Sequence, residues 1–247
     1  MAERAGFSVA DVRRAYSASK RSEEVRGEWA AWLLYRQISF LITPWFLAAP
    51  VSATAVTVCS LLIALCLPLL AVSGSEWSWV WVSLAAVLVL TLDCVDGNIA
   101  RVTHSVSRIG HYADFMTDIL YRIAFYFSIG LLIARGAAAD SVLARHAPAL
   151  AALAALLAVT ARLGRVYLES REPPAVSAAP APAESAPPAG GVYAAVFSFV
   201  SGIDSLLPLL VLAAGAAGHL RLVLLWILAY SALDFVHTQV SVLLRLR

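Results

Sequence analysis

Four aspartates lie within a 26-residue stretch of the sequence, in two pairs separated by a short polar segment. Asp93 and Asp96 are three residues apart, and Asp114 and Asp118 are four apart. Residues at these spacings share one face of an α-helix, so each pair would point two carboxylates in the same direction. Like-charged carboxylates in a poorly hydrated place either take up protons or bind cations. Because oxygen ligands suit hard divalent ions, the pattern predicts a site for Mg2+ or Mn2+.

Small residues and an arginine accompany the acidic pairs. Gly97 and Ala100 follow the first pair, and Gly110 precedes the second. Their lack of bulk leaves room for a ligand to approach the backbone. Arg101, one turn after Gly97, can offer a planar guanidinium to a phosphate. These residues together indicate phosphate chemistry, in which metal ions neutralise a pyrophosphate and a carboxylate takes the proton of an attacking hydroxyl.

The elements that carry these residues are hydrophobic enough to lie in a membrane. The chain has 247 residues, of which 61% are hydrophobic and 14% are charged, outside the usual range for soluble domains. Six apolar windows are each close in length to the about 20 residues that a helix needs to cross the hydrocarbon core of a bilayer. We therefore expect an all-α integral membrane bundle of about six transmembrane helices. The windows are 52–72, 77–99, 112–134, 147–168, 203–218 and 222–244.

Two further features of these windows concern the connection between the second and third windows and the interruption of the fifth. The connection at 101–110 allows the second and third helices to run antiparallel, so all four carboxylates could share one pocket at one membrane surface. The window at 203–218 is short and contains Asp204 and Pro208. We expect this helix to borrow length from the residues before it and to open toward a cavity at the break.

The composition divides the chain into four parts. Residues 1–49 form a charged and apolar N-terminal segment, and 50–170 hold the first four transmembrane helices with the acidic stretch. Residues 171–191 are rich in proline and alanine, a composition that favours an extended cytoplasmic linker without a core. Residues 192–247 hold the last two transmembrane helices.

The N-terminal segment is predicted to contain an amphipathic helix at the membrane interface. Trp29, Trp32 and Tyr35 are typical interface anchors. The apolar stretch that follows is broken by Pro44 and is predicted to be interfacial or re-entrant, with a separate seventh crossing as the alternative.

Basic residues predict the orientation, because lysine and arginine are retained on the cytoplasmic side. Most of them lie in the N-terminal segment, in 101–108, in 162–171 and at the C-terminus. Both termini and the acidic stretch are therefore expected to face the cytoplasm. The net charge of +2 is too small to indicate a nucleic-acid partner.

The acidic stretch is similar to the signature of the CDP-alcohol phosphatidyltransferases. It reads D-x2-D-G-x2-A-R-x8-G-x3-D-x3-D, with every fixed position occupied. The resemblance implies a six-helix membrane enzyme, commonly a homodimer among membrane lipids, in which an acceptor hydroxyl displaces CMP from a CDP-linked donor. It also favours the bacterial cytoplasmic membrane as the location. The fixed positions are Asp93, Asp96, Gly97, Ala100, Arg101, Gly110, Asp114 and Asp118.

The resemblance assigns roles position by position. The four aspartates would together hold two divalent ions, and Asp118 would also be the general base. The residues implied to shape or contact the cytidine diphosphate are Asp93, Gly97, Ala100, Arg101 and Gly110. Family members often carry Pro-Asn-x-x-Thr before the first span. Here Ala53 and Thr54 replace the first two residues, while Thr57 keeps the last position and is a further candidate for binding CDP.

Three arginines are candidates for binding the acceptor. Arg122 lies one turn after Asp118, where it could bind an acceptor phosphate or pair with the aspartate. Arg162 and Arg165 lie at the end of the fourth span, where they could bind the acceptor or set the topology. Ile119 occupies a position where branches with phosphorylated acceptors often carry a basic residue, which speaks against such an acceptor.

The function that we expect is phosphatidyl transfer from CDP-diacylglycerol to a small alcohol in phospholipid biosynthesis. A soluble CDP-alcohol with a lipid or polyol hydroxyl as acceptor is the alternative. A divalent-cation transporter is the alternative of another class, but transport sites usually lie near the bilayer midplane on broken helices. An inactive homologue is disfavoured because no motif position is lost.

Overall fold

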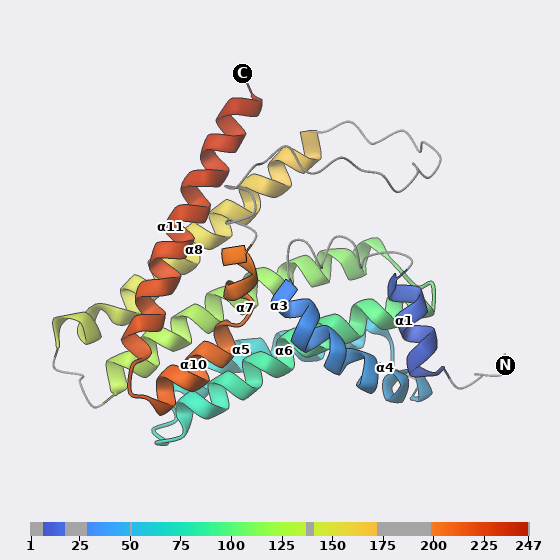
Figure 1. Cartoon of the computed structure of the whole chain (residues 1–247), viewed down its shortest axis with the longest axis horizontal. Helices are drawn as coiled ribbons and strands as arrows, with labels where there is room; N and C mark the ends of the chain where they lie inside the picture. Colours follow the sequence, from blue (N-terminus) through green and yellow to red (C-terminus); the bar gives the residue numbers. More distant parts are fainter. Residues whose placement is uncertain (1–6, 18–28, 50, 137–140, 172–198, 247) are drawn as a thin grey trace.

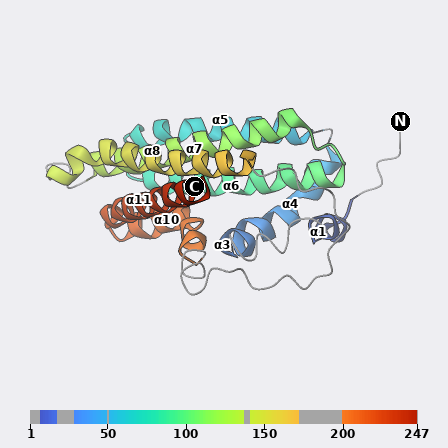
Figure 2. The ribbon, with the colours of Figure 1, turned by 90° about the horizontal axis from the view of Figure 1, so that it is seen from above.

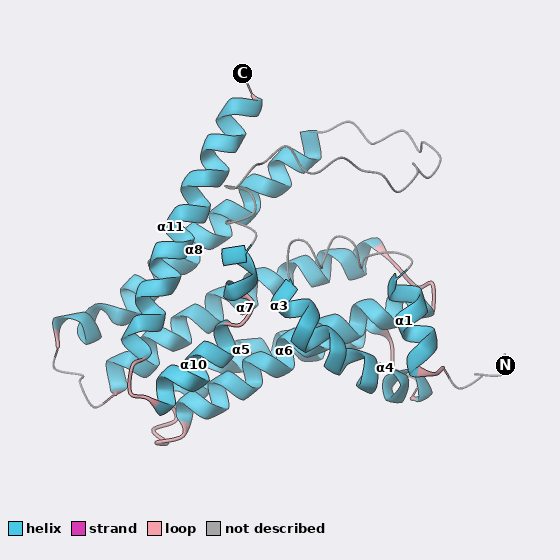
Figure 3. Ribbon diagram, in the orientation of Figure 1, coloured by secondary structure: helices cyan, strands magenta, loops and turns pink. Residues whose placement is uncertain are grey.

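The chain is described by a computed structural model that covers residues 7–17, 29–49, 51–136, 141–171 and 199–246. All regular structure in these ranges is helical (Figure 3). Five helices in this part of the chain are long and apolar enough to cross a membrane, which confirms the expected all-α membrane bundle. They are α5 (Ala53–Val72), α6 (Ser78–Val102), α7 (Arg108–Arg135), α8 (Val142–Arg171) and α11 (Leu220–Arg245).

The predicted fifth window forms a broken helix instead of a sixth long one. Residues 199–204 are helical, a turn follows at 205–206, and α10 (Leu207–Ala216) has only 10 residues. At about 1.5 Å per residue, α10 is about half as long as the hydrocarbon core is thick. Pro208 lies in the first turn of α10, where its missing N–H costs no helical hydrogen bond. The expected interruption is therefore present, and a new helix, α10, begins after it.

The long helices pack around one core in the order α6, α5, α7, α8 and α11. Helix α5 contacts both α6 and α7, α7 contacts α8, and α8 contacts α11, while α10 packs on α6. Figure 2 shows α5, α6 and α7 side by side along the long axis, and Figure 1 shows α8 and α11 running together at an angle to them. The close α7–α8 approach needs Gly130, because a Cβ there would lie 2.7 Å from the Ala147 carbonyl oxygen.

The helices that carry the acidic motif extend further than the hydropathy suggested. Helix α6 has 25 residues and α7 has 28, so both exceed the about 30 Å of a hydrocarbon core at about 1.5 Å per residue. The expected connection at 101–110 shrinks to residues 103–107. Ser107 begins α7 as its N-cap and accepts a hydrogen bond from the Gly110 amide at 3.0 Å. The four aspartates consequently lie inside the two helices, one to three turns from their ends.

The N-terminal segment forms α1 (Val9–Ser17) and a helix over 29–48. The second helix comprises α3 (Trp29–Ala31), the π-helical segment η1 (Trp32–Arg36) and α4 (Gln37–Ala48). Helix α1 packs on α4 and α6, where a small cluster of buried side chains that includes Tyr16 and Phe40 joins them. At the start of α1, hydrogen bonds from the Ser8 hydroxyl and amide lower the pKa of Asp11.

Two expectations for this segment are wrong. Pro44 lies inside α4 without ending it. Tyr35 is not an interface anchor, because it is 1% exposed and its hydroxyl donates to the Ser205 carbonyl oxygen at 2.9 Å. The predicted linker at 171–191 lies outside the described residues except for Arg171, as do residues 1–6 and 18–28 of the N-terminal segment.

Candidate active site

A first cavity, the motif cavity, lies where α6 ends and α7 begins. Its volume is about 290 Å3, and the start of α5, residues 105–107 and Arg36 of η1 complete its wall. It collects every motif position except Asp118, together with Thr57. The predicted site residues on its wall are Asp93, Asp96, Gly97, Ala100, Arg101, Gly110, Asp114 and Thr57.

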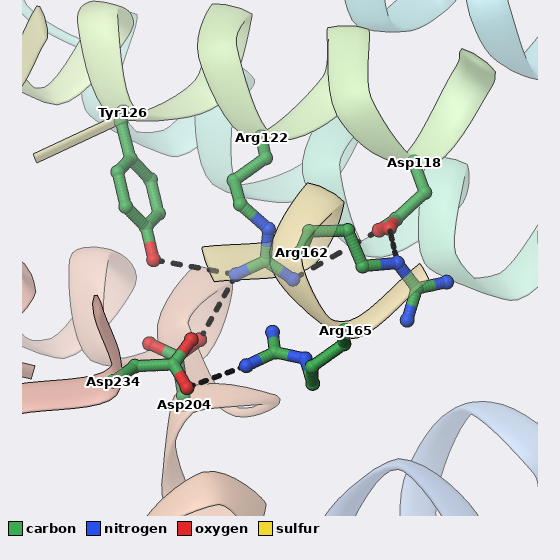
Figure 4. Close-up of polar contacts among 7 residues, drawn as sticks. All are labelled: Asp118, Arg122, Tyr126, Arg162, Arg165, Asp204 and Asp234. Carbon is green, nitrogen blue, oxygen red and sulfur yellow. Dashed lines mark hydrogen bonds and ion pairs between the residues drawn. The ribbon is translucent and has the colours of Figure 1, made fainter. Parts of the chain in front are cut away.

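A second cavity, the arginine cavity, adjoins the first on the other side of Asp93. Its volume is about 440 Å3, and it lies between α3, η1, α6, α7, α8, α11 and residues 201–208. It holds Asp118 and all three acceptor candidates, Arg122, Arg162 and Arg165. Figure 4 shows these side chains converging from α7 and α8.

The four aspartates are thus divided between two cavities, whereas the sequence predicted one shared pocket. Asp96 and Asp114 line the motif cavity, Asp118 lines the arginine cavity, and Asp93 lines both. Asp93 interacts electrostatically with the other three carboxylates and lies within hydrogen-bonding reach of Asp114. The division places Asp93 at the junction and Asp118 on the far side of it.

The chemistry of the four carboxylates fits a hard divalent cation, because all donors are oxygens and their like charges need compensation. In the described ranges, however, no three acidic, histidine or cysteine side chains are grouped as ligands of one ion. Ligation would require the carboxylates to turn toward a shared point. The metal-binding set of Asp93, Asp96, Asp114 and Asp118 therefore stays a prediction.

Thr57 holds one of the motif carboxylates in place. Its hydroxyl donates to Asp96 Oδ2 at 2.6 Å, and both side chains are nearly inaccessible to solvent. A buried carboxylate needs such donors, because an unsatisfied buried polar atom is costly. The position that this chain shares with the family's Pro-Asn-x-x-Thr element thus serves the first acidic pair, besides lining the motif cavity.

Arg101 folds back over Gly97. A Cβ at Gly97 would lie 3.1 Å from Arg101 Nη2, so the glycine makes room for the guanidinium. The same nitrogen donates to Asn98 Oδ1 at 3.0 Å. This geometry gives Gly97 a role in placing the arginine, in addition to the ligand access expected from its small size.

Asn98 is the centre of a buried polar network that the sequence did not reveal. Its Oδ1 also accepts from Arg36 Nη1 at 3.4 Å, and its Nδ2 donates to Ser39 and Thr43 at 3.0 and 3.2 Å. The network ties α6 to the helix over 29–48. Asn98 occupies a variable position of the motif, so only the polar type of this residue in an apolar helix could have drawn attention to it.

Each of the three arginines predicted to bind the acceptor faces a carboxylate (Figure 4). Asp118 lies 3.4 Å from Arg162 Nε and 3.9 Å from Arg122 Nη2. Arg122 Nη1 also lies 3.3 Å from Asp204 Oδ2. The pairing expected as an alternative for Arg122 is therefore present, and it involves a second aspartate beyond the predicted one.

The third arginine pairs with the last helix. Arg165 Nη1 donates to Asp234 Oδ1 at 2.6 Å and to Thr238 Oγ1 at 3.1 Å. Close packing of α8 on α11 makes this possible, since a Cβ at Gly164 would lie 2.9 Å from Thr238 Cγ2. Charged residues in apolar spans are candidates for such interior pairing, and this was the available signal for Asp204 and Asp234.

Comparison with known proteins agrees with the motif. The family model of the CDP-alcohol phosphatidyltransferases matches residues 50–233, which include all of α5, α6, α7 and α8 and the part of α11 up to Leu233. A comparison with curated proteins gives no match. The matched range covers well over half of the chain and contains both cavities, apart from Asp234 and the residues that α3 and η1 contribute. The chain therefore belongs to the CDP-alcohol phosphatidyltransferase family.

Proposed function

We propose that the protein transfers a phosphatidyl group from CDP-diacylglycerol to the hydroxyl of a small alcohol and releases CMP. Family membership supports a CDP-linked donor and a hydroxyl acceptor. The observation that carries the proposal is the pair of adjoining cavities, one with the nucleotide motif and one with Asp118. The donor would occupy the motif cavity, and the acceptor would enter the arginine cavity.

The reaction follows from this arrangement. The acceptor hydroxyl oxygen forms a bond to the phosphorus that carries the diacylglycerol, while the bond from that phosphorus to the oxygen of CMP breaks. CMP leaves with the electron pair, and Asp118 takes the hydroxyl proton. Arg101 would hold the phosphates from its position over Gly97. When bound to the four aspartates, Mg2+ or Mn2+ ions would neutralise the charge of the pyrophosphate.

Exposed apolar side chains support a lipid-linked donor. Val106, which lines the motif cavity, is 75% exposed, and its neighbours Ile109 and Tyr112 are exposed as well. Such a border suits acyl chains that reach the cavity from the bilayer. We also propose that both termini and the site face the cytoplasm of a bacterial membrane and that the protein is a homodimer, as the basic residues and the family resemblance indicate.

The proposal is tested by following CMP release from the purified protein in detergent with Mg2+. CDP-diacylglycerol is offered with a panel of small alcohols, and soluble CDP-alcohols are offered with diacylglycerol or polyols. We expect CMP only when CDP-diacylglycerol and an alcohol are both present. Release only from a soluble CDP-alcohol would favour the alternative donor, and no release with any pair would refute the function.

Replacing Thr57 by valine should weaken Mg2+-dependent CDP binding about tenfold, because a hydrogen bond to a charged group contributes about 1.5–3 kcal/mol. Valine keeps the shape of threonine but cannot donate to Asp96. Isothermal titration with CDP measures the effect. Thr160→Val on α8 is the matched control, since the Thr160 hydroxyl is exposed and bonds only the Leu156 carbonyl among described partners. Equal affinity in Thr57→Val and the parent would contradict the role of Thr57.

Replacing Arg162 by glutamine should raise the Michaelis constant for the acceptor about tenfold, by loss of a charge-assisted contact in the arginine cavity. CDP binding should not change, because Arg162 does not line the motif cavity. Initial rates at varied acceptor concentration measure the effect. Arg145→Gln, near the opposite end of the same helix, is the control. An unchanged Michaelis constant in Arg162→Gln would contradict acceptor binding by Arg162 and would favour a role in membrane topology alone.

A further inference from the structure

The helix over 29–48 contains the π-helical segment η1, which is the only one among the described residues. The wider turn of a π-helix is costly and occurs frequently at functional sites. In η1 it turns two polar side chains, Tyr35 and Arg36, into the protein, where both are buried. The segment precedes residue 50, so it lies outside the range that matches the family model.

The Arg36 guanidinium is held from several directions. Its Nη1 donates to the Cys94 carbonyl oxygen at 3.1 Å and lies 3.4 Å from Asn98 Oδ1. The ring of Tyr16 from α1 covers it, with 5.0 Å between the guanidinium carbon and the ring centroid. Arg36 is only 6% exposed. A buried charge is stable only with such partners, so the site keeps this arginine oriented.

Arg36 lies at the junction of the two cavities. Of the described side chains on their walls, Arg36 and Asp93 are the ones that line both cavities. In an in-line displacement the transferred phosphoryl group lies between the leaving group and the attacking hydroxyl. With the leaving nucleotide in the motif cavity and the hydroxyl in the arginine cavity, that group lies at the junction, where Arg36 is the described basic residue that lines both cavities.

We propose that Arg36 is a further catalytic residue, whose guanidinium binds the phosphoryl group during its transfer. The proposal rests on the proposed function, because that function assigns donor and acceptor to the two cavities. The bond from the acceptor oxygen to phosphorus forms, the bond to the CMP oxygen breaks, and the proton passes to Asp118. Arg36 keeps its own protons throughout and donates to the non-bridging oxygens.

A structural role predicts a different result from a catalytic one. If Arg36 only connects η1 to α6, its loss would disturb the motif cavity as a whole and weaken the binding of both CDP and CMP. If Arg36 binds the transferred phosphoryl group, its loss would weaken the binding of CDP, because the β-phosphate of CDP occupies the position of that group. CMP lacks this phosphate and would bind as before.

The experiment compares CDP and CMP binding to the full-length protein in detergent with Mg2+, and CMP release from CDP-diacylglycerol. In Arg36→Gln, we expect the CDP dissociation constant to rise about tenfold or more, with the CMP constant within about twofold of the parent. CMP release should fall about a hundredfold or more, and free guanidinium ion should restore part of it in Arg36→Ala. Arg13→Gln is the matched control, because the Arg13 guanidinium on α1 also lies over an aromatic ring, that of Phe40, and Arg13 lines neither cavity.

The outcomes separate the two proposals. A parent protein that neither binds CDP nor releases CMP refutes the proposed function, and the role of Arg36 with it. A parent that does both, beside an Arg36→Gln variant with the same CDP-to-CMP affinity ratio, overturns the Arg36 proposal alone. If Arg36→Gln does not fold, Arg36→Lys decides, since lysine keeps the charge but not the planar fork. An affinity ratio in Arg36→Lys equal to that of the parent would overturn the proposal.

Discussion

Replacing Asp118 by asparagine is expected to abolish CMP release while the protein still binds CDP. Asparagine matches the size of aspartate but cannot take the proton of the acceptor hydroxyl, and general-base catalysis contributes about 10^2- to 10^4-fold. Asp118 lines the arginine cavity and not the motif cavity, so the nucleotide should lose few of its contacts. The rate of CMP release and the CDP dissociation constant, measured on the same preparation, show whether the two effects separate.

Glu76→Gln is the matched control for Asp118→Asn. It also exchanges a carboxylate for an amide, but Glu76 lies between α5 and α6 at the end of the bundle away from the motif. The rate of CMP release by Glu76→Gln should equal that of the parent protein. Undiminished CMP release by Asp118→Asn would show that another group accepts the proton.

Replacing Asp93 by asparagine is expected to remove both CMP release and Mg2+-dependent CDP binding. Asp93 lines both cavities and interacts with the other three motif carboxylates, so its charge is central to any bound ion. Loss of several kcal/mol of metal-borne charge stabilisation corresponds to a rate decrease of about a thousandfold. Titration with CDP in the presence and absence of Mg2+ measures nucleotide binding. The electron paramagnetic resonance spectrum of added Mn2+ shows whether the ion itself is bound.

Chelation of the parent protein provides the comparison for Asp93→Asn. With EDTA the parent should lose CMP release and CDP affinity, and added Mg2+ should restore both. Asp118→Asn should keep most of its Mg2+-dependent CDP binding, because the other three motif carboxylates remain and Asp118 does not line the motif cavity. An Asp93→Asn variant whose CDP affinity still rises with Mg2+ would disprove the assignment of Asp93 as a metal ligand.

The sequence was sufficient to predict the membrane bundle and the motif face of each helix. Hydropathy identifies spans because the length of a crossing helix is set by the thickness of the bilayer. Helical periodicity brings Asp93 together with Asp96, and Asp114 with Asp118, whatever the rest of the fold does. The break near Asp204 was also predictable, since a proline and a charge in one short span interrupt an apolar helix.

Only the tertiary structure decided how these faces share space. It divides the four carboxylates between two cavities and brings in Arg36, Asp204 and Asp234. The contacts responsible join residues far apart in sequence: Arg36 and Asn98 are 62 residues apart, and Arg122 and Asp204 are 82 apart. Local periodicity tells which face of a helix a residue occupies, but the partner across the interface depends on the depth and crossing angle at which two helices pack. Those quantities arise from the whole set of interhelical contacts, such as the close approach at Gly130, and no single helix encodes them.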